Sequence, residues 1–299
     1  MNQAYQKQVS LLLDVLPEVA KETCFAMHGG TAINLFVRNM PRLSIDIDLT
    51  YIRFSGREEA LEEINTALSR IKQRIEDLRS SIHVRHKDQI CKLHLDEHGV
   101  LIKIEVNMIG RGLLGDSNNA HLCETAQENF DVFCVMPLVS LAQLYGGKIC
   151  AALDRQHPRD LFDVKLLLDN EGFTDEIKRG FILGLVSSNR PTHELLDPNL
   201  IDQKLVYESQ FEGMSSVEFS YSDFEVTRHK LIQIVKGVLT DGDKKFLLCL
   251  NRLLPDWSIY DYQRFPAVRW KILNLEKFKR DNSQAYEKQL GALDAVLMQ

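Results

Sequence analysis

Asp46 and Asp48, two aspartates separated by one residue, are the residues of this 299-residue sequence best suited to chemistry. They belong to the segment 43–50, whose strict alternation of apolar and polar residues predicts a strand. Side chains two positions apart in a strand share a face, so we expect both carboxylates side by side. Adjacent carboxylates repel unless a cation lies between them, and magnesium prefers one or two carboxylates plus substrate phosphates. Alone, the pair is more typical of an exposed polar face on an edge strand.

A glycine-rich turn precedes these aspartates. Gly29, Gly30 and Thr31 follow a short apolar segment, 24–28, that predicts a strand, and they begin a segment, 31–37, that predicts a helix with Thr31 near its cap. Glycines let the backbone approach a phosphate closely, and the N–H groups of a helix start, with a threonine hydroxyl, can bind it. By itself the turn is an ordinary strand–helix connection. Followed by two aspartates, it predicts a triphosphate site next to a metal site.

A third carboxylate comes from the segment 100–106, which also predicts a strand. The alternation there places Lys103, Glu105 and Asn107 on one face. Nucleotidyl transfer by two metal ions generally needs a third carboxylate, so Glu105 would complete the metal site or act as the base for an attacking hydroxyl. An exposed ladder of Lys and Glu explains the same pattern equally well.

A cluster of charged residues follows in the second half of the chain. Lys148 and Arg155 fall near one face of a predicted helix, and the next predicted helix carries Arg159, Asp160 and Asp163 in its first turns. Cations placed in this way can neutralise the charge that a triphosphate develops in the transition state. The two aspartates could orient those cations by bidentate pairing. A purely structural network of salt bridges is the competing interpretation.

The order of predicted elements indicates an α+β protein in two domains. Residues 1–136 combine amphipathic helices, expected over 3–22 and 58–78, with the strands of a mixed sheet. Three strands are expected at 82–85, 90–95 and 100–106, with a turn at 97–99 before the last. Residues 137–299 predict helices, interrupted by a polar and irregular stretch, 187–222.

The distribution of charge makes a nucleic-acid partner possible. The chain carries a formal net charge of −6, yet residues 226–299 contain about 13 Lys/Arg and 8 Asp/Glu, a local excess of roughly +5. A charge run of this kind is more often a solvated face.

No apolar stretch is long enough for a membrane span and no secretory signal precedes residue 20, so we expect a cytoplasmic protein without a membrane partner.

Taken together, these motifs resemble a known family. Gly29–Thr31 with the segment 42–49 looks like motif I of the polymerase-β-like nucleotidyltransferases, and the likeness extends over about 29–290. Thr31 stands where the commoner form has serine, and the hydroxyl is kept. The blocks that resemble the AbiEii/AbiGii toxin branch are Lys148 to Arg155, Arg159–Asp163, His193–Pro198 and Phe265–Asn274.

The resemblance implies a polymerase-β-like domain over 1–136, a helical domain over 137–299, and a toxin of a type IV toxin–antitoxin or abortive-infection system. Its implied substrates are a nucleoside triphosphate with magnesium, or manganese, and the acceptor end of tRNA. Its implied partner is a separately encoded antitoxin of the winged-helix repressor type. The implied roles are metal ligands for Asp46 and Asp48, phosphate contacts for Gly30 and Thr31, triphosphate binding for Lys148, and the last acidic motif for Asp163 or Asp160.

Three functions remain open. The leading hypothesis is two-metal transfer of a nucleotidyl group to a nucleic-acid hydroxyl, with Asp46, Asp48 and Glu105 holding the metals and Lys148 and Arg155 the triphosphate. The second is the same transfer to a hydroxyl of a protein. The third is a nucleotide-binding module that acts through a partner without chemistry. Under the leading hypothesis, four basic residues would contact RNA phosphates: Arg264, Arg269, Lys271 and Lys277.

Overall fold

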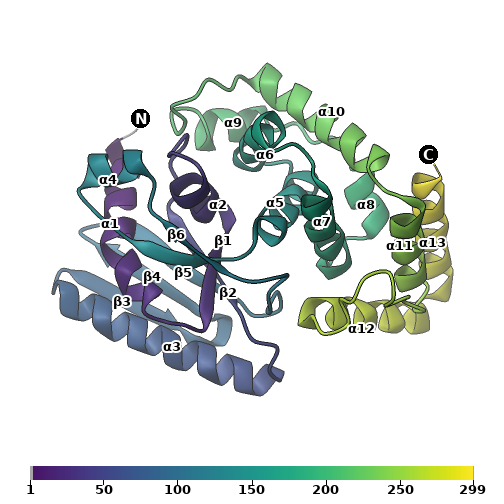
Figure 1. Ribbon diagram of the computed structural model, residues 1–299, viewed down its shortest axis with the longest axis horizontal. Coiled ribbons are helices and arrows are strands. Elements are labelled where there is room, and N and C mark those ends of the chain that lie inside the picture. The colour runs from purple at the N-terminus through teal and green to yellow at the C-terminus, as the bar shows by residue number, and fades with distance from the viewer. Residues whose placement is uncertain (1–2, 299) are drawn as a thin grey trace. The chain divides into compact units, whose positions relative to one another are not determined.

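The computed structural model describes residues 3–298, which divide into two compact units. The first unit comprises the chain up to Ser140 together with Gln210–Glu218, and the second comprises Leu141–Ser209 and the chain from Phe219. Figure 1 shows the strands in the first unit and a succession of helices in the second. The α+β class is confirmed.

A mixed sheet forms the centre of the first unit. Across the described residues it has seven strands in the order β3-β4-β5-β2-β1-β7-β6. β2 pairs in parallel with β5, and β1 with β7, while the other neighbours are antiparallel. The strands are β1 (Phe25–His28), β2 (Asp46–Tyr51), β3 (Ile82–Lys87), β4 (Lys92–Glu97), β5 (Val100–Asn107), β6 (Asn118–His121) and β7 (Val135–Leu138).

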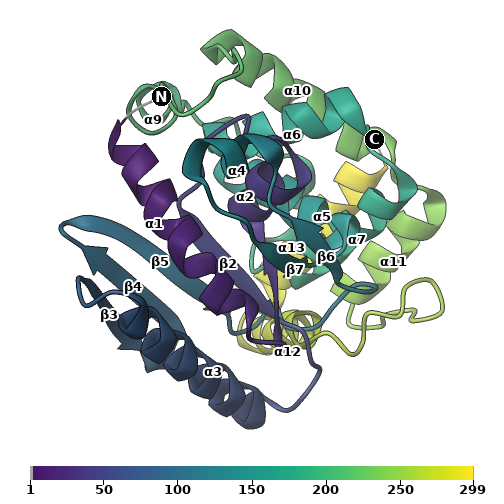
Figure 2. The ribbon, with the colours of Figure 1, turned by 60° about the vertical axis from the view of Figure 1, so that its left-hand side comes forward.

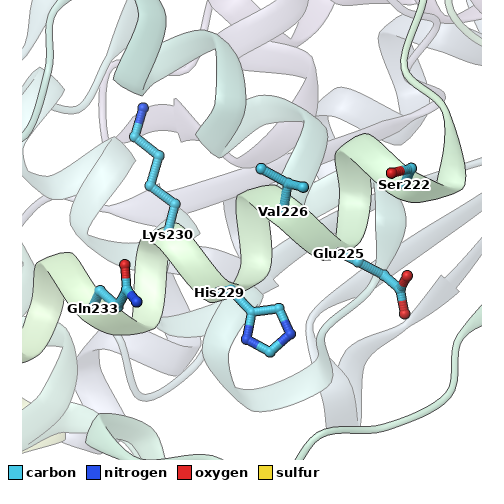
Figure 3. Close-up of a pocket in the computed structure, with 6 residues that line it drawn as sticks. All are labelled: Ser222, Glu225, Val226, His229, Lys230 and Gln233. Carbon is cyan, nitrogen blue, oxygen red and sulfur yellow. The ribbon is translucent and has the colours of Figure 1, made fainter.

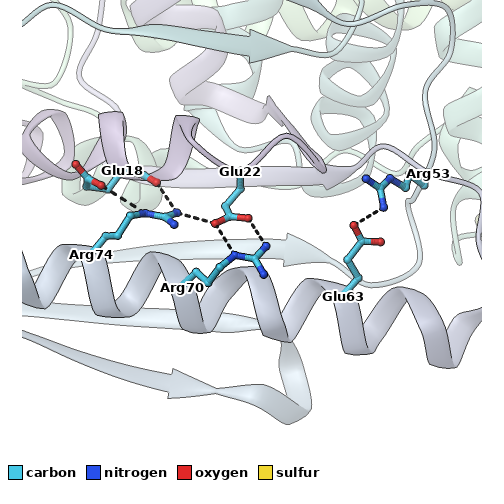
Figure 4. A network of polar contacts seen from close by, with 6 residues as sticks. All are labelled: Glu18, Glu22, Arg53, Glu63, Arg70 and Arg74. Carbon is cyan, nitrogen blue, oxygen red and sulfur yellow. Dashed lines mark hydrogen bonds and ion pairs between the residues drawn. The ribbon is translucent and has the colours of Figure 1, made fainter.

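Two long helices, α1 (Gln3–Ala20) and α3 (Arg57–Leu78), pack on one face of this sheet, as Figure 2 shows. The strands turn apolar side chains towards them, for example Ile47 of β2 and Ile104 of β5, both fully buried. Ion pairs join Glu18 of α1, and Glu22 just after its end, to Arg70 and Arg74 of α3 (Figure 4). The opposite face of β2 and β5 carries the polar positions of the same strands.

Four shorter helical segments complete the described part of the first unit. α2 (Gly29–Ala32) is a single turn that continues directly into a π-helical segment, Ile33–Val37, and α4 (Glu124–Phe130) precedes β7. A short 3₁₀ turn, Asp88–Ile90, connects β3 to β4. The turn expected before β5 is confirmed, since His98 and Gly99 both have positive φ angles, of 54° and 84°.

The second unit contains the helices from α5 onward. α5 and α7 approach so closely that a Cβ at Gly180 would collide with the backbone of Ala142, which explains the glycine there. Capping boxes begin α10 and α11. The helices are α5 (Leu141–Arg155), α6 (Pro158–Asn170), α7 (Asp175–Ser187), α8 (Thr192–Leu196), α9 (Lys204–Gln210), α10 (Tyr221–Gly237), α11 (Asp241–Asn251), α12 (Pro266–Asp281) and α13 (Ser283–Leu297).

The stretch 187–222 differs from its expected irregular structure. It contains α8 and α9, and its residues 210–218 belong to the first unit. There, Met214 accepts a hydrogen bond from the backbone N–H of Leu43 at 2.9 Å, and Ser215 forms a β-bridge with Arg42. Among the described residues, no helix has the length and apolar character needed to cross a membrane.

Candidate active site

The sheet places three carboxylates on adjacent strands of the first unit. Asp46 and Asp48 occupy alternate positions of β2, where both are half-buried, between the buried positions of the strand. In the parallel pairing of β2 with β5, Glu105 stands directly opposite Asp48. Paired residues of neighbouring strands project to the same face of a sheet. The three carboxylates predicted from the sequence are therefore on one face of two neighbouring strands.

Lysines lie among these carboxylates. Lys103 stands opposite Asp46 in the sheet, and its Nζ lies 3.7 Å from Asp46 Oδ1 and 3.8 Å from Glu105 Oε2. Lys92 of β4 stands opposite Glu105 on the other side, with Nζ at 2.8 Å from Oε1. These ammonium groups offset the repulsion between the carboxylates, as a bound cation would.

The glycine turn lies against Asp48. Gly29 has a φ of +81°, which L side chains rarely adopt, and a Cβ there would collide with the Asp48 carboxylate. A Cβ at Gly30 would lie 2.7 Å from a guanidinium nitrogen of Arg42 and 3.1 Å from Ser44 Oγ. Gly29 is therefore required by its φ and by its close approach to Asp48, and the turn brings backbone to the edge of the carboxylate site.

Thr31 has a different local role from the expected helix cap. The helix begins at Gly29 with His28 as its N-cap residue, so Thr31 lies inside it and is fully buried. Its hydroxyl bonds to Ser44 Oγ at 2.9 Å and to the backbone oxygen of Asp46. Thr31 thereby ties the turn to the start of β2, and the buried hydroxyl group is directed at the protein.

A pocket of about 300 Å³ adjoins the carboxylates at the end of β5. Asp48 and Glu105 form part of its wall, and Ile90 and Ile109, which are 40% and 39% exposed, supply apolar surface. All of its lining belongs to the first unit: His28, Asp48, Ile90, Lys92, Glu105 and residues 106–109.

The carboxylates fit a magnesium ion that also binds substrate phosphate. Asp46 and Asp48 are both partly exposed, and carboxylate oxygens are the ligands that magnesium uses together with substrate phosphates. Within residues 3–298, no group of three or more His, Cys, Asp or Glu side chains is arranged as a complete metal cage. The donor set is therefore an aspartate pair, and Glu105 as a metal ligand stays a prediction.

In the second unit, four of the predicted residues form one charged cluster. Lys148 of α5 is buried, and its Nζ lies 2.9 Å from Asp160 Oδ1 and 3.0 Å from Asp163 Oδ2. Arg155, with an exposed side chain, pairs with the second oxygen of Asp160 at 2.7 Å. Lys148 and Arg155 lie seven residues apart, which is two turns of one helix, so α5 presents both cations to the aspartates of α6.

The start of α6 fixes the aspartates of this cluster. Pro158 occupies the first helical position, and the ring of His157 accepts a hydrogen bond from the backbone N–H of Arg159 at 3.1 Å. The side chain of Arg159 is half-buried. Burial by itself raises the pKa of Asp160, but the charges of Lys148 and Arg155 outweigh it and hold that pKa at about 2. Asp160 is thus an anion at neutral pH.

One expectation for the basic C-terminal region is wrong. Lys271 is only 4% exposed, and its ammonium donates to the backbone oxygens of Ser188 and Arg190, each at 2.7 Å. Lys271 therefore caps the carboxyl end of α7, and its ammonium is too buried to contact RNA. Arg264, Arg269 and Lys277 are exposed, as expected for contacts with phosphates.

A second hollow lies along α10 (Figure 3). Its lining comes from one helix, so it is an open surface, and none of the predicted site residues takes part in it. The lining residues are Ser222, Glu225, Val226, His229, Lys230 and Gln233.

Comparison with known protein families identifies the family to which this sequence belongs. The profile of the nucleotidyl transferase AbiEii toxin family, described as a type IV toxin–antitoxin system, matches residues 10–226. The chain belongs to the AbiEii family. The match covers the glycine turn, the three carboxylates and the Lys148 cluster, and it ends before α12. Membership shows a nucleotidyltransferase toxin, with a nucleoside triphosphate as substrate and an antitoxin as partner.

A solved structure has the same fold as this AbiEii-family chain. MenT4, a nucleotidyltransferase toxin from Mycobacterium tuberculosis H37Rv, superposes with a TM-score of 0.61 over 89% of this chain and 92% of its own. The sequence identity is 14%, so the likeness concerns the fold. A search of curated proteins found no match.

Sequence reasoning missed several residues of the site. Ser44 and Arg42 were noted only as parts of a motif, although Ser44 is two residues before Asp46 and shares the alternation. Lys92 gave no signal, because its position opposite Glu105 depends on the register of β4 against β5. Residues 210–218 carry no local pattern that predicts pairing with residues 41–43.

Proposed function

We propose that this AbiEii-family toxin transfers a nucleotidyl group from a nucleoside triphosphate to a hydroxyl of RNA, at the acceptor end of tRNA. The observation that carries the proposal is the row formed by Asp48 and Glu105 on paired strands, with Asp46 beside it and Gly29 against it. Carboxylates on one face of paired strands, beside a glycine turn at the start of a helix, are the groups that a magnesium-bound triphosphate requires.

In the proposed reaction, the acceptor oxygen bonds to the α-phosphorus, and the bond from this phosphorus to pyrophosphate breaks. Asp46 and Asp48 would hold magnesium, or manganese, which supplies charge neutralisation for the phosphates. Glu105 receives the proton of the acceptor hydroxyl, and the ammonium of Lys92 lies 2.8 Å from its Oε1. The turn at Gly29 and Gly30 lies against the phosphates.

The second unit contributes positive charge in this proposal. Lys148 and Arg155 bind the triphosphate, and Asp160 and Asp163 hold the two cations in position. The exposed residues Arg264, Arg269 and Lys277 contact RNA phosphates, in keeping with the net charge of roughly +5 over 226–299.

The test is an incorporation assay. The purified chain is incubated with magnesium, total tRNA and each of the four labelled nucleoside triphosphates in turn. We expect label on tRNA with at least one nucleotide, and a decrease of about a thousandfold for Asp48→Ala, because a carboxylate that holds the metal is worth several kcal/mol. Asp77→Ala, an exposed aspartate of α3, is the control and keeps full activity.

Two outcomes contradict the proposal. Label on a protein band, with none on tRNA, shows a protein acceptor. Absence of transfer from wild type under every nucleotide, together with toxicity that survives Asp46→Asn, shows a module that acts by binding alone.

A further inference from the structure

The hairpin of β3 and β4 has one covered face and one open face. The hairpin packs on α3, and its apolar side chains, such as Val84 and Leu93, are buried (Figure 2). The alternate positions of the same strands include Arg85 and His94, and both are exposed. Because side chains alternate between the two faces of a strand, Arg85 and His94 lie on the face away from α3.

Strand register connects this open face to the carboxylates of the candidate active site. Arg85 of β3 stands opposite His94 of β4, and His94 stands opposite Lys103 of β5. Lys103 in turn stands opposite Asp46 of β2. Paired residues project to the same face, so this row crosses four neighbouring strands on one side of the sheet. With about 4.8 Å between strands, the backbone of Arg85 lies about 14 Å from that of Asp46 along the row.

Positive charge is concentrated on the open face of the hairpin. Lys87 stands directly opposite Lys92, an arrangement in which like charges repel. Partial burial lowers the pKa of His94, and four neighbouring cations lower it further. These cations are Arg85, Lys87, Lys92 and Lys103. The face therefore has a positive potential that disfavours a further positive charge and attracts an anion.

The guanidinium of Arg85 is available to such an anion. In the part of the chain that the structure describes, no carboxylate lies within ion-pair distance of Arg85. By contrast, Lys92 pairs with Glu105. Asp96, an acidic residue on the same face of β4, accepts a hydrogen bond from the backbone N–H of Gly99 at 3.0 Å. The open face thus carries an exposed arginine among like charges, with no partner within the described residues.

A chain of phosphates fits this face. An arginine forms bidentate hydrogen bonds with a phosphate, and a neutral imidazole donates one through its ring N–H. Because Arg85 is about 14 Å from Asp46, a ligand that contacts both ends of the row must be an extended chain rather than a single triphosphate. A nucleic-acid backbone carries a negative charge at every nucleotide, which matches the row of cations.

We propose that the open face of the β3–β4 hairpin binds the phosphate backbone of the RNA substrate, away from its reacting end, through Arg85 and His94. The inference rests on the proposed function, in which RNA is the acceptor. It adds a backbone contact in the first unit, separate from the basic residues of the C-terminal region. Phosphate contacts position a nucleic acid without reading its sequence, so the face serves any RNA that presents the same end.

Binding of tRNA without nucleotide tests the contact apart from transfer. Total tRNA labelled with fluorescein is titrated with wild type and variants at several salt concentrations, and anisotropy gives the dissociation constant. For Arg85→Gln, loss of one phosphate contact lowers the slope of log affinity against log salt by about 0.7–0.9, which means about five- to eightfold weaker binding at about 0.1 M salt.

Two further variants are the controls. Arg85→Lys keeps the charge and restores most of the affinity and the wild-type slope. Lys7→Gln removes an exposed cation from α1, on the other side of the sheet, and binds tRNA as wild type does. Circular dichroism and thermal unfolding of each variant show whether the sheet is intact, so that a folding defect is distinguished from a binding defect.

Two further measurements separate RNA from the triphosphate. Binding of each nucleoside triphosphate with magnesium is measured by calorimetry without RNA, and Arg85→Gln leaves that affinity unchanged. Diethyl pyrocarbonate, which modifies neutral imidazoles, is applied to wild type with and without tRNA, and mass spectrometry identifies the modified residues. We expect tRNA to protect His94, whereas His121, exposed on β6, is modified equally in both samples.

Each outcome has one meaning. A wild type that labels tRNA, with an Arg85→Gln variant that binds tRNA with an unchanged slope, overturns the binding face and leaves the proposed function standing. Weaker binding of the nucleotide by Arg85→Gln, or a His94 that tRNA does not protect, has the same meaning. A wild type that neither binds nor labels tRNA contradicts the proposed function and the binding face together.

Discussion

Gly29 lies against the carboxylate of Asp48 so closely that no Cβ fits between them, and its φ of +81° excludes most other residues. We predict that Gly29→Ala displaces Asp48 and lowers nucleotidyl transfer at least about a hundredfold, because a small misplacement of a catalytic group has an effect of that size. Gly99→Ala is the matched control: Gly99 has a φ of +84° but open space around it. Both variants lose about 1 kcal/mol of stability to backbone strain, and only Gly29→Ala loses activity. Equal activities would show that the contact with Asp48 is unimportant.

Lys103 competes with any metal that binds beside Asp46. Its ammonium lies within 4 Å of both Asp46 and Glu105, in a position where a divalent cation would be attracted to the same carboxylates. We predict that Lys103→Met lowers the magnesium concentration needed for half-maximal transfer. A titration of activity against magnesium measures it, with Lys87→Met of β3, outside this group, as the control. An unchanged or higher requirement would contradict competition between Lys103 and metal.

Lys148 holds two buried carboxylates. The side chains of Asp160 and Asp163 are 5% and 0% exposed, so removal of the ammonium leaves two negative charges in the interior. We predict that Lys148→Met lowers the free energy of unfolding by about 3–5 kcal/mol, measured by denaturant titration. Lys165→Met, which removes a partly exposed pair with Asp169 on α6, lowers it by less than about 0.5 kcal/mol. Similar losses in both variants would mean that the aspartates find other partners.

The low pKa of Asp160 predicts acid sensitivity. Its pKa in the folded chain is about 2, below the ordinary value of 3.8. A carboxyl with a lowered pKa stabilises the folded state above its unfolded pKa, and this stabilisation is lost as the pH falls towards 2. The loss is about 2 kcal/mol. Unfolding free energies of wild type and Asp160→Asn, compared from pH 5 to pH 2, should converge as the pH falls. A constant difference would place the pKa of Asp160 near its ordinary value.

Buried Lys271 predicts that stability rises with pH in alkali. Burial lowers the pKa of Lys271 to about 8, although the charge of Cys150 acts in the other direction. Between pH 8 and the ordinary lysine value of 10.5, the unfolded chain binds more protons at this residue than the folded chain does, so its contribution to stability rises with pH, by about 3 kcal/mol in total. Lys271→Met lacks this rise. The difference in unfolding free energy between the two proteins should change over that interval, and a flat difference would rule out the lowered pKa.

Local patterns predicted the central part of the candidate site because its geometry is local. The alternation around Asp46 and Asp48 is a property of one strand, and it put both carboxylates on one face before any partner strand was known. The turn at Gly29 was predicted for the same reason, because a turn between a strand and a helix depends on residues that are adjacent in the chain. The helix was expected to start at Thr31, with Thr31 near its cap, but it begins at Gly29, and the Thr31 hydroxyl bonds to Ser44 and to the start of β2.

Long-range relationships could not be predicted in the same way. Lys271 stands in a basic segment and was expected at the surface. Its ammonium instead donates hydrogen bonds to two carbonyl oxygens that lie about 80 residues away in the chain. The pairing of residues 210–218 with residues 41–43 is of the same kind. Such contacts depend on which surfaces meet after folding, and a single sequence carries no local signal for them.

The sequence by itself determined the chemical groups of this protein. These are the Asp46 and Asp48 pair, the glycine turn before it, and the residues Lys148 and Asp163, which belong to the blocks that resemble the family. These depend on residue type and on spacings within one strand, turn or helix. Only the tertiary structure decided that Glu105 stands opposite Asp48, that Lys92 and Lys103 lie among the carboxylates, and that a pocket opens beside them. The physical reason is strand register, which is set by the packing of apolar faces against α1 and α3 and has no counterpart in local spacing.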